Sequence, residues 1–172
     1  MDAFQLASSM TLYTFVAIAV VMDFQAQRIG NRLIVLGIAT GLMFQLLQNG
    51  MEGFVHGLVG MSIPVILLFL LYLMAIIGAG DIKLFSMIGV FVTYQQLMYT
   101  MAFAFVAGAM LSLVILLRNR TVLGDLRNGL CYLGDLVTGH FHPYEGRRKE
   151  SNLMHFSIAI CIGLVIAKGG ML

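Results

Sequence analysis

Two stretches of this chain run for more than 20 residues without an Asp, Glu, Lys or Arg side chain, residues 54–77 and residues 97–117. A helix of about 20 apolar residues spans the hydrocarbon core of a bilayer. Only 10% of all residues are charged, whereas a soluble domain carries about 25%. We therefore expect lipid to surround much of the folded chain. Because the sequence has no basic patch interleaved with aromatic residues, we expect no nucleic-acid partner.

Six apolar segments, separated by polar turns or glycine-containing breaks, predict an all-α, polytopic membrane protein of about six transmembrane helices. We assign all of them to a single domain, residues 1–172. The long polar segment 118–152 has leucine and valine residues at helical spacing. This pattern predicts an amphipathic helix on the cytoplasmic membrane surface, and it also fits a lid over a site between the helices. The expected spans are residues 6–22, 33–48, 54–77, 82–93, 97–117 and 153–167.

The basic residues predict the orientation of these spans. With six spans, nine of the ten Lys and Arg residues fall on the side that holds the turns before spans 2, 4 and 6, and only Lys168 falls on the other side. Basic loops of membrane proteins face the cytoplasm. We therefore expect a multi-pass protein of the cell membrane with its N-terminus outside.

Two acidic residues, Asp23 and Asp81, stand at the ends of apolar runs and not in solvated loops. Because the first and third spans both run from outside to inside, both carboxylates are expected at the cytoplasmic ends of their helices. An Asp at a helix end is usually a boundary residue or a cap. Two Asp residues on the same side of the membrane, in a chain with so few charges, indicate a functional site instead.

A close pair of carboxylates is what an aspartyl peptidase uses. The two groups cannot both ionise at low cost, so one keeps a proton while the other acts as a base on the attacking water. The protonated group polarises the scissile carbonyl and later protonates the leaving amine. Since the groups titrate as a pair, the sequence leaves open which one holds the proton.

Residues beside Asp81 suit the same chemistry. Gly78 and Gly80 would let the backbone leave the helix and let an extended substrate approach closely. Non-helical backbone at membrane depth is tolerated where it lines a wet cavity, as an active site does. Lys83 would favour an ionised aspartate or hold a substrate carbonyl.

The chain resembles the prepilin peptidases, polytopic aspartyl enzymes of bacteria and archaea that carry a GxGD motif. This motif reads Gly-Ala-Gly-Asp at residues 78–81, and Ile-Lys-Leu follows it. In the family, a first aspartate after the first core helix precedes a short polar stretch and then Ile-Pro-Asn. Here Asp23 is followed by Ile-Gly-Asn at residues 29–31, so glycine stands where proline is typical. The resemblance extends over residues 12–117.

The resemblance implies the role of each matching residue and the reaction. The reaction is cleavage, at the cytoplasmic membrane face, of the N-terminal leader of type IV prepilin-like or pseudopilin precursors, with no cofactor and no metal. Larger bacterial members also carry a cysteine-rich insert and methylate the new N-terminus. This chain lacks that insert, so it resembles the small peptidase-only or preflagellin type. The implied catalytic residues are Asp23 and Asp81, and the implied supporting or substrate-binding residues are Gly78, Gly80, Lys83 and Asn31.

Other functions remain open at this point. A small ion or proton-coupled transporter would also use paired membrane aspartates beside a glycine break, although we detect no inverted repeat. A membrane scaffold without chemistry would leave the one-sided acid pair unexplained. His140, His142 and Glu145 suggest a metal site only weakly, because histidines in a polar loop are more often solvated. Membrane lipid is an expected partner in every case.

Overall fold

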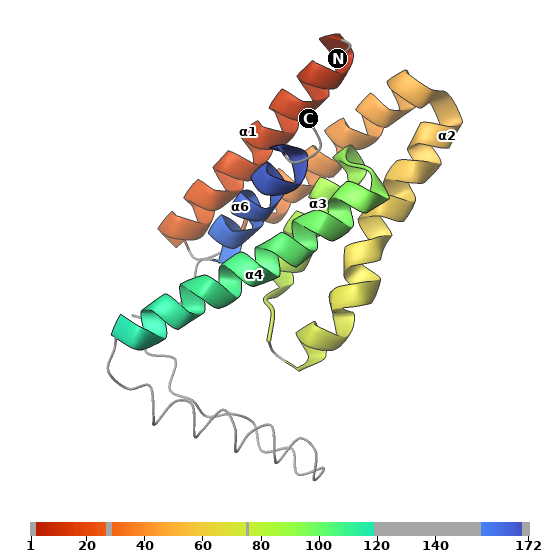
Figure 1. Cartoon of the computed structure of the whole chain (residues 1–172). Coiled ribbons are helices and arrows are strands. Elements are labelled where there is room, and N and C mark those ends of the chain that lie inside the picture. Colours follow the sequence, from red (N-terminus) through yellow and green to blue (C-terminus); the bar gives the residue numbers. More distant parts are fainter. Residues whose placement is uncertain (1–2, 27–28, 75, 119–155, 170–172) are drawn as a thin grey trace. The chain divides into compact units, whose positions relative to one another are not determined.

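The computed structural model describes residues 3–26, 29–74, 76–118 and 156–169 (Figure 1). All regular secondary structure in these ranges is helical, as the sequence predicts. The chain divides into two compact units, Met1–Ala107 with His155–Leu172, and Gly108–Met154. Segment 119–155, with most of the expected amphipathic helix, lies outside the described residues. The helices are α1 (Ala3–Ala26), α2 (Asn31–Leu73), α3 (Ala79–Phe91), α4 (Tyr94–Arg118) and α6 (Phe156–Gly169).

Three of the described helices are long and apolar enough to cross a membrane, namely α1, α2 and the Tyr94–Val114 part of α4. α6 is a shorter apolar helix. Large apolar side chains such as Leu47 and Ile66 stay exposed, which is expected where lipid takes the place of water. These properties indicate a membrane protein. The count of six spans, their orientation and the assignment of one domain stay predictions.

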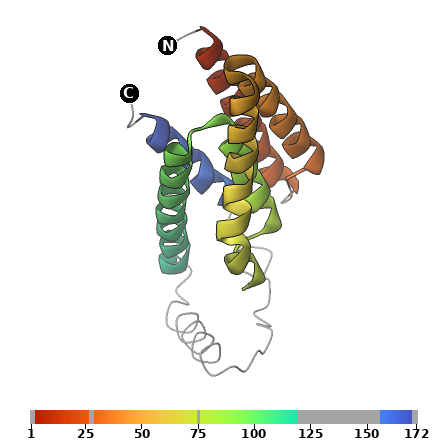
Figure 2. The same ribbon diagram turned by 90° about the vertical axis from the view of Figure 1, so that its right-hand side faces the viewer.

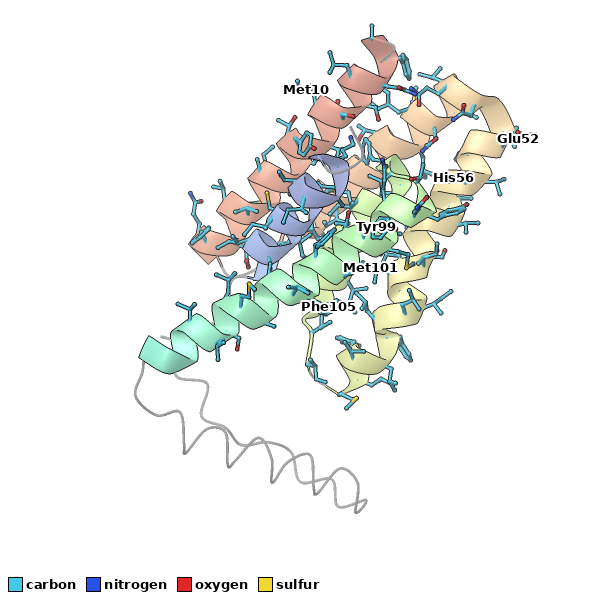
Figure 3. The ribbon with its side chains drawn as sticks, in the orientation of Figure 1. Met10, Glu52, His56, Tyr99, Met101 and Phe105 are labelled. Atoms are coloured by element: carbon cyan, nitrogen blue, oxygen red, sulfur yellow. The ribbon has the colours of Figure 1, made fainter. Side chains whose placement is uncertain are left out.

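α2 joins two segments that we expected as separate spans, residues 33–48 and 54–77. Its 43 residues would reach about 65 Å as a straight helix, roughly twice the thickness of a bilayer's hydrocarbon core. The backbone is non-helical at Gly50, where φ is 60°, a value that glycine adopts readily because it lacks a Cβ atom. The chain turns back there (Figures 1 and 2), and Glu52 and His56 follow in the second segment (Figure 3). Each segment is long enough for one span.

The break before α3 differs from our expectation. We expected both Gly78 and Gly80 to leave the helix, but only Gly78 has extended backbone, with φ −76° and ψ 148°, as the residue before α3. Gly80 is helical, because the hydrogen bonding of α3 already begins where the amide of Asp81 donates to the carbonyl of Gly78 over 3.1 Å. Asp81 therefore lies in the first turn of α3, where the helix dipole favours a carboxylate.

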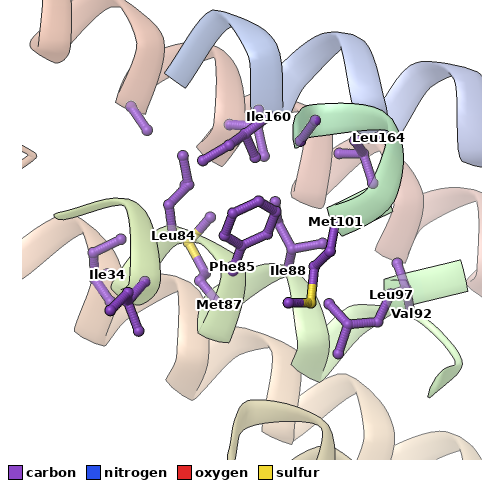
Figure 4. Packing of buried hydrophobic residues seen from close by; sticks show 14 of the residues in the cluster. Ile34, Leu84, Phe85, Met87, Ile88, Val92, Leu97, Met101, Ile160 and Leu164 are labelled. Atoms are coloured by element: carbon purple, nitrogen blue, oxygen red, sulfur yellow. The ribbon is translucent and has the colours of Figure 1, made fainter. Parts of the chain in front are cut away.

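α3 is the buried centre of the first unit. Residues 84–90 of this helix are all buried, as expected for a helix that is apolar on all sides, and α3 contacts α1, α2 and α6. The ring of Phe85 lies 6.5 Å from the rings of both Phe105 and Phe156, measured between centroids. Figure 4 shows the cluster around Phe85. This packing holds α3, and the acid in its first turn, against its neighbours.

Small residues let α2 and α3 approach each other closely. Gly60 of α2 faces Gly89 of α3, and a Cβ atom at either position would clash with the carbonyl oxygen of the other. A Cβ atom at Gly37 would similarly meet the side chain of Met87. Membrane helices commonly pack through small residues, since lipid offers no hydrophobic force to drive them together.

Candidate functional site

The two acids that the sequence singles out lie near each other in the structure. Asp23 is in the last turn of α1, and Asp81 is the third residue of α3. Both side chains are partly buried. Asp81 precedes the expected fourth span and lies outside the helices that are long enough to cross a membrane. Burial, and secondly the negative charge of Asp23, raise the pKa of Asp81 from 3.8 to about 6.

Gly78 stands directly against the carboxyl group of Asp81. A Cβ atom at Gly78 would lie 3.2 Å from Oδ2 of Asp81, which is tighter than ordinary packing. The backbone of Gly78 also hydrogen-bonds to this side chain and so opposes the rise of its pKa. At Gly80 the nearest atoms to an added Cβ belong to Ile29, at an ordinary 3.9 Å. The structure therefore gives a steric reason for the first glycine of the motif but not for the second.

Lys83 and Asn31 form a direct link between two helices. The ammonium group of Lys83, in α3, donates a hydrogen bond of 2.8 Å to Oδ1 of Asn31, the first residue of α2. Both side chains are exposed. The sequence predicts that Lys83 acts on an aspartate or on a substrate carbonyl, and in the structure its ammonium group bonds to the amide oxygen of Asn31.

Ser157 is a further polar residue at this site, and no motif in the sequence points to it. Its hydroxyl donates a hydrogen bond of 2.6 Å to Oδ2 of Asp23, and the side chain is fully buried. Ser157 lies in the first turn of α6. The sequence does offer an indirect indication of Ser157, because the expected sixth span begins on the same side of the membrane as the two acids. A serine in its first turn was thus a candidate partner.

A second polar region lies at the other ends of the same helices. It is a cavity of about 530 Å³ bordered by both segments of α2 and by the turn between α3 and α4. The ammonium group of Lys168, near the end of α6, donates to Oγ of Ser9 in α1 over 2.5 Å. Among the described residues, the only carboxylate that lines it is that of Glu52. The lining residues are Gln5, Ser8, Ser9, Gln45, Gln48, Asn49, Glu52, Gly53, His56, Phe91, Val92, Thr93, Gln96 and Lys168.

The described part of the chain contains no group of three His, Cys, Asp or Glu side chains that could hold a metal ion. The weak metal candidates His140, His142 and Glu145 lie outside it.

The sequence model of the type IV leader peptidase family matches residues 10–113, a range that contains Asp23, Asp81 and their glycine, lysine and asparagine neighbours but ends before Ser157. No curated protein and no solved structure matches the chain.

Proposed function

Because this chain belongs to the type IV leader peptidase family, we propose that it is a membrane aspartyl endopeptidase with Asp23 and Asp81 as its catalytic residues. Its proposed substrates are type IV prepilin-like precursors, which lose their N-terminal leaders at the cytoplasmic face of the cell membrane. The observation that carries the proposal is that α1 and α3 bring the carboxyl of Asp81 within range of the charge of Asp23. Two carboxyl groups in one partly buried site suit acid–base hydrolysis of a peptide bond.

The proposed reaction needs only this chain and water. One carboxylate removes a proton from the water that attacks the scissile carbonyl, and the protonated carboxyl polarises that carbonyl. Gly78 leaves space beside Asp81, so the acid keeps the orientation that the first turn of α3 gives it. We propose no cofactor and no metal.

Lys83 and Asn31 are the proposed substrate-binding residues. Both are exposed and joined by a hydrogen bond, and Lys83 follows Asp81 by two residues in α3. An ammonium group and an amide can hold backbone carbonyls of an extended peptide. The excess of Lys and Arg on this side of the expected spans supports a cytoplasmic location through the positive-inside rule.

The proposal does not include methylation of the new N-terminus. Family members with that activity carry a cysteine-rich insert, and this chain has only two cysteines, Cys131 and Cys161. Methylated mature pilin made by this protein alone would overturn this part of the proposal.

The test is cleavage of a prepilin-like precursor that is co-expressed in turn with the native protein and with three variants. Asp23→Asn and Asp81→Asn each remove one ionisable carboxyl and keep its shape. Glu52→Gln is the matched control, since it removes a carboxylate at the cavity on the other ends of the helices. We expect leader removal by the native protein and by Glu52→Gln. We expect a loss of about a thousandfold or more in each Asp variant, because each lacks one of the two groups that transfer protons.

Two other outcomes would contradict the proposed function. Cleavage that survives either Asp substitution would rule out the acid pair as the catalyst. If several precursors stay intact while ion flux into liposomes depends on Asp81, the transporter hypothesis replaces the peptidase.

A further inference from the structure

We propose that Ser157 is a positioning residue that holds Asp23 as the ionised general base, so that Asp81 carries the proton of the pair. This inference rests on the proposed peptidase function. It answers the question that the two acid residues alone leave open, namely which of them starts the reaction as the base.

The length of the hydrogen bond supports this assignment. Ser157 Oγ lies 2.6 Å from Oδ2 of Asp23. A hydroxyl that donates to an ionised carboxylate typically lies at about 2.5–2.7 Å, whereas neutral hydroxyl pairs lie at about 2.7–2.8 Å. Ser157 is 0% exposed, so water does not compete for its proton. The contact therefore fits a carboxylate that bears the charge.

At Asp81, burial and the charge of Asp23 outweigh the backbone hydrogen bond of Gly78 and favour the protonated state. Its carboxyl is partly buried in the first turn of α3, close to the negative charge of Asp23. Both factors raise its pKa to about 6. Its nearest cationic neighbour in α3, Lys83, donates to Asn31. The proton of the pair is therefore better placed on Asp81.

The charged groups on the elements around the pair are few in the described residues. α3 contributes Asp81 and Lys83, and the start of α2 contributes the exposed Arg32. α6 contributes Ser157 at this end and carries Lys168 near its other end. At this end of α6, the Ser157 hydroxyl donates to Oδ2 of Asp23.

The assignment defines each proton transfer in the hydrolysis. Asp23 takes a proton from water as the water oxygen bonds to the scissile carbonyl carbon, and Asp81 donates a hydrogen bond to the carbonyl oxygen. When the tetrahedral intermediate collapses, the C–N bond breaks and Asp81 gives its proton to the leaving nitrogen. The proton on Asp23 then passes to Asp81. One water is consumed, and the pair returns to its starting state.

The test uses the full-length protein with Ser157→Ala, Ser157→Thr and the matched control Ser86→Ala. Ser86 is also buried, but its hydroxyl donates to the carbonyl of Ile82 in its own helix. The measurement is kcat and KM for leader cleavage across pH 4–9. We expect Ser157→Ala to lower kcat about tenfold to a hundredfold with little change in KM. The dependence of its kcat/KM on pH should shift from the native profile, since the base loses its donor.

Two comparisons separate positioning from a structural role. Ser157→Thr keeps the hydroxyl, so it should restore the native pH profile even if its extra methyl group lowers Tm. Ser86→Ala should leave the profile unchanged. An unshifted profile in Ser157→Ala, or a shifted one in Ser157→Thr, would overturn the proposal.

The same experiment distinguishes the two proposals from each other. Cleavage by the native protein that Asp23→Asn abolishes supports the peptidase whatever Ser157 does. A failure confined to the Ser157 variants then rejects the positioning role alone. Absence of cleavage by the native protein rejects the peptidase, and the positioning role falls with it.

Discussion

Both ends of α1, α3 and α6 carry polar side chains, but the two ends differ in chemistry. We call the site of Asp23, Asp81 and Ser157 the carboxylate end, and the region around the 530 Å³ cavity the cavity end. In α1, Asp23 and Ser9 are 14 residues apart, which is about 21 Å along the helix. The cavity end has the large volume, yet its lining is mostly amides and hydroxyls. Among the described residues, only the carboxylate end brings two acids together, so the large cavity and the candidate catalytic pair lie at different ends of the helices.

The polar groups at the two ends of these helices are in different environments. At the cavity end, polar groups bond to other protein groups, as Lys168 does to Ser9 and Gln45 to the carbonyl of Val90. At the carboxylate end, burial and the negative charge of Asp23 raise the pKa of Asp81 and so disfavour its ionised form. Perturbed acids of this kind cluster at functional sites. Three predictions sharpen the contrast, in order of decreasing effect.

The largest expected effect is a dependence of stability on pH that comes from the carboxylate end. The pKa of Asp81 is about 6 in the folded state and near 3.8 in the unfolded state, so the folded state binds more protons between these values. The free energy of unfolding should therefore fall as pH rises from about 4 to 6, by roughly 2 kcal/mol. Asp81→Asn cannot ionise and should lack this fall, so its Tm should exceed the native value more at pH 7.5 than at pH 4.

Thermal unfolding in detergent at both pH values measures this difference. Glu52→Gln, at the cavity end, is the control and should follow the native curve. A native Tm that changes with pH in the same way as the Tm of Asp81→Asn would contradict the prediction.

A smaller effect is expected from the glycines of the motif. Gly78→Ala places a methyl group 3.2 Å from Oδ2 of Asp81 and should reduce cleavage about tenfold, equivalent to about 1.4 kcal/mol. Gly80→Ala meets only Ile29 at ordinary distance and should stay within about twofold of native activity. Initial rates of leader removal measure both. Equal losses in the two variants would show that substrate approach, and not the position of Asp81, requires the motif's glycines.

The smallest effect is expected at the cavity end. Gln45→Ala removes the hydrogen bond of 3.0 Å from Nε2 to the carbonyl of Val90, which joins α2 to α3. It should lower the free energy of unfolding by about 1 kcal/mol and leave kcat/KM for cleavage unchanged. Gln48→Ala, at an exposed position on the same cavity, is the control for stability. A marked loss of cleavage in Gln45→Ala would show that the two ends are coupled.

Local patterns predicted the helices well but placed some of their ends incorrectly. Long apolar runs predicted α1 and α4, because a run without charges has few alternatives in a membrane. The turn expected near residue 50 is present as the positive φ of Gly50, where the backbone of α2 is non-helical between its two segments. The start of α3 was misplaced by three residues, because a glycine signals a break without specifying which neighbour leaves the helix.

The sequence by itself determined that the chain belongs in a membrane, that Asp23 and Asp81 stand at helix ends of the same expected side, and that the motif around Asp81 matches the family. These features depend on residue order along one chain. Only the tertiary structure decided that Ser157, 134 residues away, donates to Asp23 and that Asp81 is partly buried within range of the charge of Asp23. Such contacts depend on how each helix is rotated about its axis and how closely its neighbours pack, as the contact of Gly60 with Gly89 allows.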